Sequence, residues 1–293
     1  MPLELTLPAD PDAISLEEYI QAIDSGRYDF SSQADLIDSA RFLRRLANNR
    51  TFLLDKMFAE LKTIADFQRT NYYGPQVFML HVAEKYFVRA NVWKPLSQVE
   101  KGIKGFQYDV CHDHNFDILT VGYFGPGYCA RCYTYDPRDV CGLLGEKVAL
   151  VPDGLFTLNE GRIALYRAKR DVHIQLPPDD ISVSLNLIPK NEQLRHLQFQ
   201  FDETSGRICR YLQASGSELV VRLAGVLGDK TCLELLAEIS DKNPSPHIRA
   251  LAVVSQLQIS PKDCIPGDHS ALVRDVVDKE LRSYGTCLKA YDC

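Results

Sequence analysis

The stretch YRAKRDVHIQLPPDDISVSLNL, residues 166–187, decides the fold class because it predicts two strands joined by a proline-containing turn. After the turn, apolar and polar residues alternate strictly: Ile181, Val183, Leu185 and Leu187 against Ser182, Ser184 and Asn186. Successive side chains of a strand point to opposite faces, so one face of this strand is apolar and the other is polar. In a barrel, such a polar row either faces bulk water or lines the interior.

Outward from this stretch, short strand-like segments alternate with turn signals from Gly105 to about Arg210, which is typical of an antiparallel sandwich or barrel. Residues 15–68 show helical spacing of apolar residues, with a capping-box pattern at Ser15 and Glu18 and a break near Asn48 and Asn49. Strand-favouring residues begin near Gln76, and helical stripes return from Ser217. We therefore predict an α+β protein with N-terminal helices (1–75), an antiparallel β-barrel (76–212) and C-terminal helices (213–293).

A second motif, CHDHNFD at residues 111–117, places two histidines one residue apart. On a strand, His112 and His114 would point to the same face while Asp113 points away, which is a geometry that presents two imidazoles to one metal ion. Two such histidines also occur on ordinary wet surfaces. A third candidate ligand, His173, precedes the turn of the stretch quoted above, and its position favours an interior metal site.

These motifs resemble those of the cupin superfamily of double-stranded β-helix proteins over about residues 105–189. His112 and His114 match the first cupin motif, and His173 matches the second. The Glu that commonly completes the first motif is missing, because Ile118 and Leu119 occupy its place. The resemblance therefore implies a three-histidine centre, a carboxylate supplied by Asp117 or Glu160, or no metal. The segment NPSPHIRALAVVSQLQI, residues 243–259, resembles a single HEAT-type repeat unit.

The resemblance implies a mononuclear non-heme metal enzyme, and a histidine centre with open positions suits Fe(II), with Zn, Ni, Mn and Cu as alternatives. We expect an oxygenase or dioxygenase that oxidises a small polar molecule with dioxygen. One alternative is a metal-dependent isomerase or lyase that needs no oxygen. Another is a non-catalytic ligand- or partner-binding protein with HEAT-like helices.

Several residues near these motifs are candidates for roles in catalysis or substrate binding. A tyrosine hydroxyl could donate a proton, and Tyr123 and Tyr166 are the candidates, although strand tyrosines are commonly packing residues. Arg162 could bind a substrate carboxylate, or it could lie on a solvated strand face. The residues expected to line the substrate site are Ser182, Ser184 and Asn186.

The CxxC formed by Cys129 and Cys132 raises the question of a zinc site shared with the histidines. We expect Gly125–Gly127 to form a hairpin turn. Cys129 would then pair near Phe124, too far along the strand from His114 to share an ion. The two cysteines are therefore interpreted as ordinary thiols.

Composition narrows the function further. The net charge of -6 and the absence of a Lys- or Arg-rich run argue against nucleic acid as a partner. The chain has neither a signal-peptide pattern nor an apolar run long enough to cross a membrane, so we expect a cytoplasmic protein with no membrane partner. Helices on both sides exceed what a minimal barrel needs, and an alternative use for them is a homodimer interface.

Overall fold

The computed structural model describes residues 1–62, 68, 71, 73–99, 108–190, 197–213, 216–243, 245–261, 274, 277, 278 and 280. The chain divides into two compact units. The first contains residues 1–137 and 149–194, and the second contains residues 138–148 and 195–293. The finer boundaries predicted at 75/76 and 212/213 stay predictions.

Three N-terminal helices open the first unit: α1 (Leu16–Ser25), α2 (Gln33–Asn48) and α3 (Phe52–Leu61). The capping box predicted at the start of α1 is present, since the Ser15 hydroxyl accepts from the Glu18 amide and the Glu18 carboxylate accepts from the Ser15 amide. Asn49 separates α2 from α3, and its side-chain oxygen accepts from the Phe52 amide at 3.2 Å. The predicted break between these helices is confirmed.

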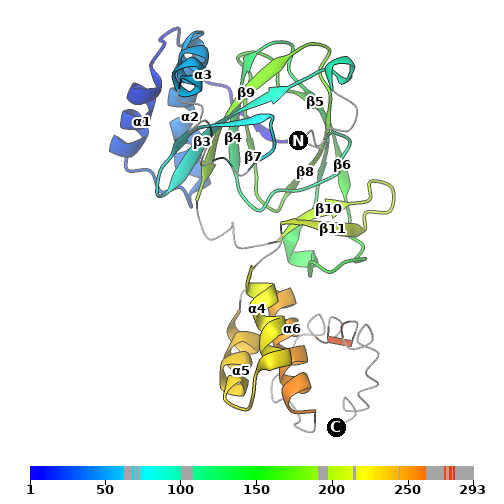
Figure 1. The fold of residues 1–293 in the computed structure, drawn as a ribbon. Helices are drawn as coiled ribbons and strands as arrows, with labels where there is room; N and C mark the ends of the chain where they lie inside the picture. Colours follow the sequence, from blue (N-terminus) through cyan, green and yellow to red (C-terminus); the bar gives the residue numbers. More distant parts are fainter. Residues whose placement is uncertain are drawn as a thin grey trace. The chain divides into compact units, whose positions relative to one another are not determined.

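The first unit also contains two antiparallel sheets, whose strands follow the helices except for β1. The larger has the strand order β1 (Leu3–Glu4), β7 (Ile163–Tyr166), β4 (Ile118–Phe124), β9 (Ser182–Pro189), β3 (Tyr86–Trp93) and β2 (Val77–Val82). The smaller has the order β6 (Val151–Thr157), β5 (Cys129–Thr134) and β8 (Asp171–Leu176). In Figure 1 the two sheets face each other, and the helices cover the outer face of the larger one. The combination of helices with antiparallel sheets confirms the α+β class. Among the described strands the two sheets are separate, so a closed barrel is not confirmed.

Two hydrophobic clusters hold these layers together. One packs the helices against the outer face of the larger sheet, through residues such as Leu36, Leu43 and Leu187. The other lies between the sheets and contains Trp93, Tyr166 and other residues of both. Successive residues of β9 point alternately to its two faces. The predicted apolar face, with Val183, Leu185 and Leu187, packs in the cluster that contains the helices. The predicted polar face of β9 is buried in the interior instead of facing water.

The turn after β4 corrects one prediction. β4 pairs with β7 and β9, whereas β5 pairs with β6 and β8, so Gly125–Gly127 connects two sheets and is not a hairpin turn. Gly125 and Gly127 have φ angles of 82° and 83°, in the left-handed region that favours glycine. The hairpin prediction was wrong because turn chemistry marks a reversal of the chain without specifying which strands then pair.

The second unit combines a hairpin with helices. Its elements are β10 (Gln198–Phe201), β11 (Ile208–Gln213), α4 (Gly216–Leu227), α5 (Cys232–Lys242) and α6 (Pro246–Ile259). Short 3₁₀ turns lie at Leu96–Gln98 and Pro137–Asp139. The helices share a small core that includes Val221, Leu236 and Leu251, but a HEAT-type repeat is not shown. The last of the helical stripes predicted beyond Ser217, SALVRDVVDKEL at residues 270–281, lies largely outside the described residues. No described helix has the length and apolar character needed to cross a membrane.

Candidate metal centre

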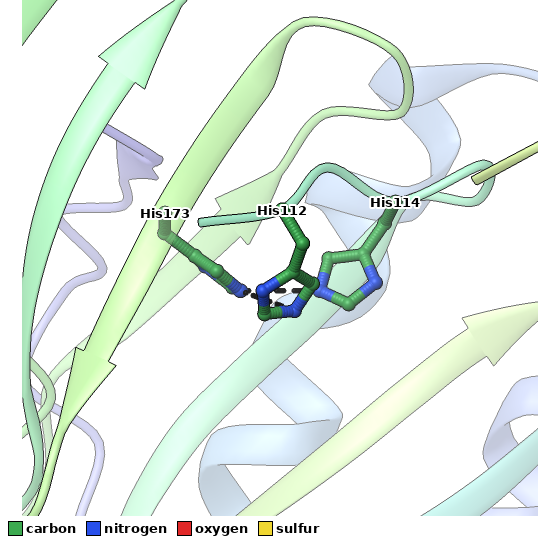
Figure 2. Close-up of side chains that lie close together, drawn as sticks. All are labelled: His112, His114 and His173. Atoms are coloured by element: carbon green, nitrogen blue, oxygen red, sulfur yellow. Dashed lines mark hydrogen bonds between the residues drawn. The ribbon is translucent and has the colours of Figure 1, made fainter. Parts of the chain in front are cut away.

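Three histidines converge in the first unit. The Nε2 atom of His173 lies 3.2 Å from Nε2 of His112 and 3.3 Å from Nε2 of His114. The three rings approach one another edge to face, and all three side chains are buried (Figure 2). The structure therefore brings together the three residues that the sequence predicts as metal ligands.

Backbone pairing explains why these side chains meet. The segment that carries His112 runs antiparallel to β8, and His112 and His173 exchange two backbone hydrogen bonds of 3.1 and 2.9 Å. Directly opposed residues of antiparallel strands point to the same face. Beyond His112 the pairing is irregular, and the His114 carbonyl accepts from the Lys169 amide at 2.8 Å. The two histidines point together as predicted, although the segment is not a regular strand.

The protonation state of the cluster suits a metal. Burial lowers the pKa of His112 and lowers the pKa of His114 and His173 well below the usual range. Near neutral pH the imidazoles are therefore uncharged, which is the form that binds metals. The Val110 carbonyl lies 2.8 Å from Nδ1 of His112 and can only accept, so Nδ1 carries the proton and Nε2 presents a lone pair to the cluster.

Asp113 anchors the segment between the two ligands. Its side chain is fully buried, and its Oδ2 accepts from the Tyr135 hydroxyl at 2.7 Å and from Nζ of Lys169 at 3.2 Å. A carboxylate held by both a cation and a hydroxyl fixes the backbone that carries it. Asp113 therefore positions the histidines on either side, and it does not belong to the group of potential ligands.

The two carboxylates that sequence reasoning left open lie elsewhere. The Asp117 carboxylate accepts from the Ala168 amide and from the Gln33 side chain of α2. Glu160 forms an exposed ion pair with Arg50 at 3.0 Å. Among the described residues, the group of potential ligand atoms contains only His112, His114 and His173.

The two predicted catalytic tyrosines occupy different places. The Tyr166 ring centroid lies 4.7 Å from that of His173, and its hydroxyl lies 3.4 Å from that of Tyr128. Tyr123 packs on the opposite face of the larger sheet against Phe52, and its hydroxyl donates to the Asn49 carbonyl. The structure brings Tyr166 to the histidines and does not bring Tyr123 there.

The predicted substrate-binding residues also separate. Arg162 forms a bidentate ion pair with Glu4 and donates to the Thr157 carbonyl. Ser182, Ser184 and Asn186 are all buried on the interior side of β9. Ser184 accepts from the Trp93 indole at 3.1 Å, and Ser182 accepts from the Gly127 amide.

Sequence reasoning missed Arg89, which lies on the interior side of β3. In the segment YFVRANVW, Arg89 has the same parity as Phe87 and Trp93, both of which pack in the cluster between the sheets. Only 7% of Arg89 is exposed, and burial lowers the pKa of its guanidinium. A single charged residue in a strand of otherwise uncharged, mainly apolar residues was the available signal.

The CxxC comes closer to the histidines than predicted. Cys132 lies directly opposite His173 in the pairing of β5 with β8, because the turn at residues 125–127 leads into the smaller sheet. Burial raises the pKa of the Cys132 thiol to about 11, so the thiol is protonated near neutral pH. Its sulfur lies 3.6 Å from the Ala130 carbonyl, and neither cysteine belongs to the described ligand group.

The distances from the His173 nitrogen to the other two suit a single ion, and the ligand atoms of all three histidines lie within 4.8 Å of one another. For a metal–nitrogen bond of about 2.1 Å, neighbouring nitrogens of an octahedral or tetrahedral site are about 3.0 to 3.4 Å apart. The separations of 3.2 and 3.3 Å fall in this range. Three neutral imidazoles that turn nitrogens toward one another form a site for a cation, and this donor set suits several divalent metals.

Comparison with known proteins gives limited information. No family model and no curated protein matches the chain. A hydroquinone 1,2-dioxygenase in complex with Cd2+ and 4-hydroxybenzonitrile is 14% identical, covers 42% of this chain and 69% of its own, and has a TM-score of 0.27. The corresponding enzyme from Sphingomonas sp. TTNP3, with 4-hydroxybenzoate bound, is 11% identical over 48% of this chain and 77% of its own, with a TM-score of 0.26.

A structure of DMSP lyases is 15% identical to this chain, covers 39% of it and 46% of its own chain, and has a TM-score of 0.23. At these TM-scores the alignments establish no common fold. The site is therefore defined by its own geometry, as a buried set of three histidines that could hold one metal ion.

Proposed function

We propose that this protein is a mononuclear non-heme metal enzyme of cupin type, and that with Fe(II) bound it oxidises a small polar molecule with dioxygen. The observation that carries the proposal is the convergence of three buried imidazole nitrogens from two segments 59 to 61 residues apart. The sequence motifs HxH and a later His support the same assignment. Fe(II) supplies open coordination positions at which substrate and dioxygen can meet.

The residues of the chain provide the rest of the site. His112, His114 and His173 hold the metal as neutral ligands, and the Val110 carbonyl and Asp113 fix the segment that carries two of them. Tyr166 lies beside His173, and burial raises its pKa well above the usual value, so it carries a proton and can donate it or a hydrogen bond. The enclosing sheets limit the access of water to this interior.

A second candidate function is a metal-dependent isomerase or lyase. The observation that favours it is the donor set itself, because three imidazoles also suit Zn, Ni, Mn and Cu. In such an enzyme the metal would act as a Lewis acid and the protonated Tyr166 as a hydrogen-bond or proton donor, without dioxygen.

Oxygen consumption separates the two candidates. The protein would be reconstituted with Fe(II) under anaerobic conditions and screened in an oxygen electrode with small organic acids and amines. We expect substrate-dependent oxygen uptake that is abolished in His112→Ala and retained in His81→Ala, a matched histidine outside the cluster. Uptake that survives in His112→Ala would contradict the proposal, and turnover without oxygen would assign the lyase or isomerase function.

A further inference from the structure

Arg89 is a buried cation in the interior of the first unit, and the described part of the chain places no counter-ion beside it. It forms no ion pair with any residue that the structure describes, and its Nε atom is buried without a hydrogen-bond partner. Its guanidinium lies 4.7 Å from the centroid of the Tyr73 ring, which offers no negative charge. A buried charge without an opposite charge beside it is strongly destabilising, so this arrangement calls for an anion that the described residues do not supply.

Asn186 adds a second free donor next to Arg89. The two residues are directly opposed in the pairing of β3 with β9, so their side chains share the interior face. The Asn186 Oδ1 atom accepts from the Thr120 hydroxyl at 2.6 Å, which turns Nδ2 away from that bond and leaves it buried without a partner. Two unsatisfied N–H groups on neighbouring strands therefore point into the same interior.

The histidine cluster borders the same interior. Trp93, on the Arg89 face of β3, lies 4.5 Å from Tyr128 between ring centroids, and the Tyr128 hydroxyl lies 3.4 Å from that of Tyr166. The Tyr166 ring in turn lies 4.7 Å from that of His173, so a short series of side-chain contacts joins the Arg89 face to the ligands. A guanidinium binds a carboxylate through paired, charge-assisted hydrogen bonds, and an amide N–H beside it can donate to the same group. A metal ion on the histidines would add further positive charge to this side of the interior.

We propose that Arg89 and Asn186 bind the carboxylate of a small organic acid that reacts at the three-histidine centre. The assignment of the reaction rests on the proposed function, whereas the binding of the carboxylate does not require the metal. The sequence suggested Arg162 as the residue that binds a substrate carboxylate. We assign this role to Arg89 instead, because no described carboxylate neutralises it. The substrate class narrows from small polar molecules to carboxylic acids.

Trp93 provides a direct readout, because it is the single tryptophan of the chain and shares the interior face of β3 with Arg89. Metal-free and metal-loaded protein would each be titrated with matched acid and amide pairs, namely acetate and acetamide, glycolate and glycolamide, and benzoate and benzamide. Inorganic phosphate would serve as a further arm. We expect at least one acid to change the Trp93 fluorescence saturably while its amide does not.

Two variants assign the response to the proposed residues. Arg89→Gln removes the cation, and Asn186→Asp places a carboxylate opposite Arg89 while it keeps an oxygen for the Thr120 hydroxyl. Each variant should weaken acid binding by roughly tenfold or more. Arg89→Gln loses the charge-assisted contact with the acid, and in Asn186→Asp the new carboxylate already pairs with Arg89. Arg41→Gln, which removes an exposed arginine of α2, should leave binding unchanged. The use of two variants keeps the test decisive if one of them fails to fold.

Four results would overturn the proposal: no response to any acid, an equal response to acid and amide, an acid response that persists in both variants, or a response to phosphate alone. These outcomes are independent of the metal. A protein that binds acids through Arg89 but holds no metal would contradict the proposed function and leave the carboxylate site standing. A protein that holds the metal but binds no acid would contradict the carboxylate site and leave the proposed function standing.

Discussion

Asp113 shows how the centre depends on a residue outside the group of potential ligands. The residue lies between two of the proposed ligands, and its buried carboxylate is paired with Lys169 and Tyr135. Asp113→Asn would leave Lys169 in a largely buried place without its counter-charge. We expect the free energy of unfolding to fall by about 3 kcal/mol, as measured by urea denaturation.

The double variant Asp113→Asn/Lys169→Met is the control for this prediction. If the loss comes from the uncompensated ammonium group, removal of that group should recover most of the stability. A double variant that is less stable than Asp113→Asn alone would show that the ion pair is not the cause.

Asp117 gives a prediction with a defined pH dependence. Burial raises the pKa of its carboxyl above the usual 3.8, although the Ala168 amide and Gln33 act in the opposite direction. Folding therefore favours the protonated form, and the resulting stabilisation, present below about pH 3.8, is lost as the pH rises through the folded-state pKa. At pH 7 the buried carboxylate is charged and reduces stability.

Asp117→Asn removes that charge and keeps the oxygen that both donors use. We expect the variant to be equal to the unmodified chain or more stable by up to about 1 kcal/mol at pH 7, and the difference should shrink toward pH 4. Urea denaturation at the two pH values measures this. A variant that loses stability at pH 7 would show that the hydrogen bonds need the charged acceptor.

Single residues also mark where sequence reasoning succeeded and failed. His112 and His114 were predictable as a pair because residues two apart on an extended segment share a face, and His173 was predictable from its match to the second cupin motif. Arg89 was missed because its meaning depends on the absence of a counter-ion, which requires knowledge of all its neighbours. The anchoring of Asp113 was missed for the same reason, since Tyr135 and Lys169 are distant in sequence.

At the scale of secondary-structure elements, the connection between β4 and β5 is the most constrained feature. Gly127 has a positive φ, and a Cβ atom there would collide with the Leu158 carbonyl. We expect Gly127→Ala to lower the free energy of unfolding by more than about 3 kcal/mol, because backbone strain and a steric clash act together. Chemical denaturation of both proteins measures the change.

Gly161→Ala is the matched control in the same unit. Gly161 also has a positive φ, but the nearest described atom to a new Cβ is a flexible arginine side-chain atom at 3.6 Å. Gly161→Ala should therefore lower the free energy of unfolding by about 1 to 2 kcal/mol, the cost of backbone strain alone. Equal losses in the two variants would contradict the steric account of the connection.

The elements themselves were largely predictable, whereas their partners were not. The capping box at Ser15, the break at Asn49 and the alternation of β9 are local patterns, and all three are present. The assignment of β4 and β5 to different sheets depends on long-range pairing. Glycines at a turn permit either a hairpin or a passage between sheets, so the sequence could not decide between them.

At the scale of the whole molecule, the α+β class follows from the order of helical and strand-like periodicities. A closed barrel did not follow, because alternation shows that both faces of a strand are used without showing how the sheet edges meet. The two compact units could not be predicted either, since residues 138–148 join the hairpin β10–β11 far along the chain. Backbone bonds such as that of the Gly145 amide to the Ile208 carbonyl make this connection.

The central claim is that three buried histidines form one metal site, and metal content tests it most directly. Elemental analysis of anaerobically purified and Fe(II)-reconstituted protein would compare the unmodified chain with His112→Ala, His173→Ala and the control His81→Ala. The account predicts about one ion per chain in the unmodified protein and in His81→Ala, and almost none in the other two variants. No metal in the reconstituted protein, or metal that persists in folded His112→Ala and His173→Ala, would contradict it.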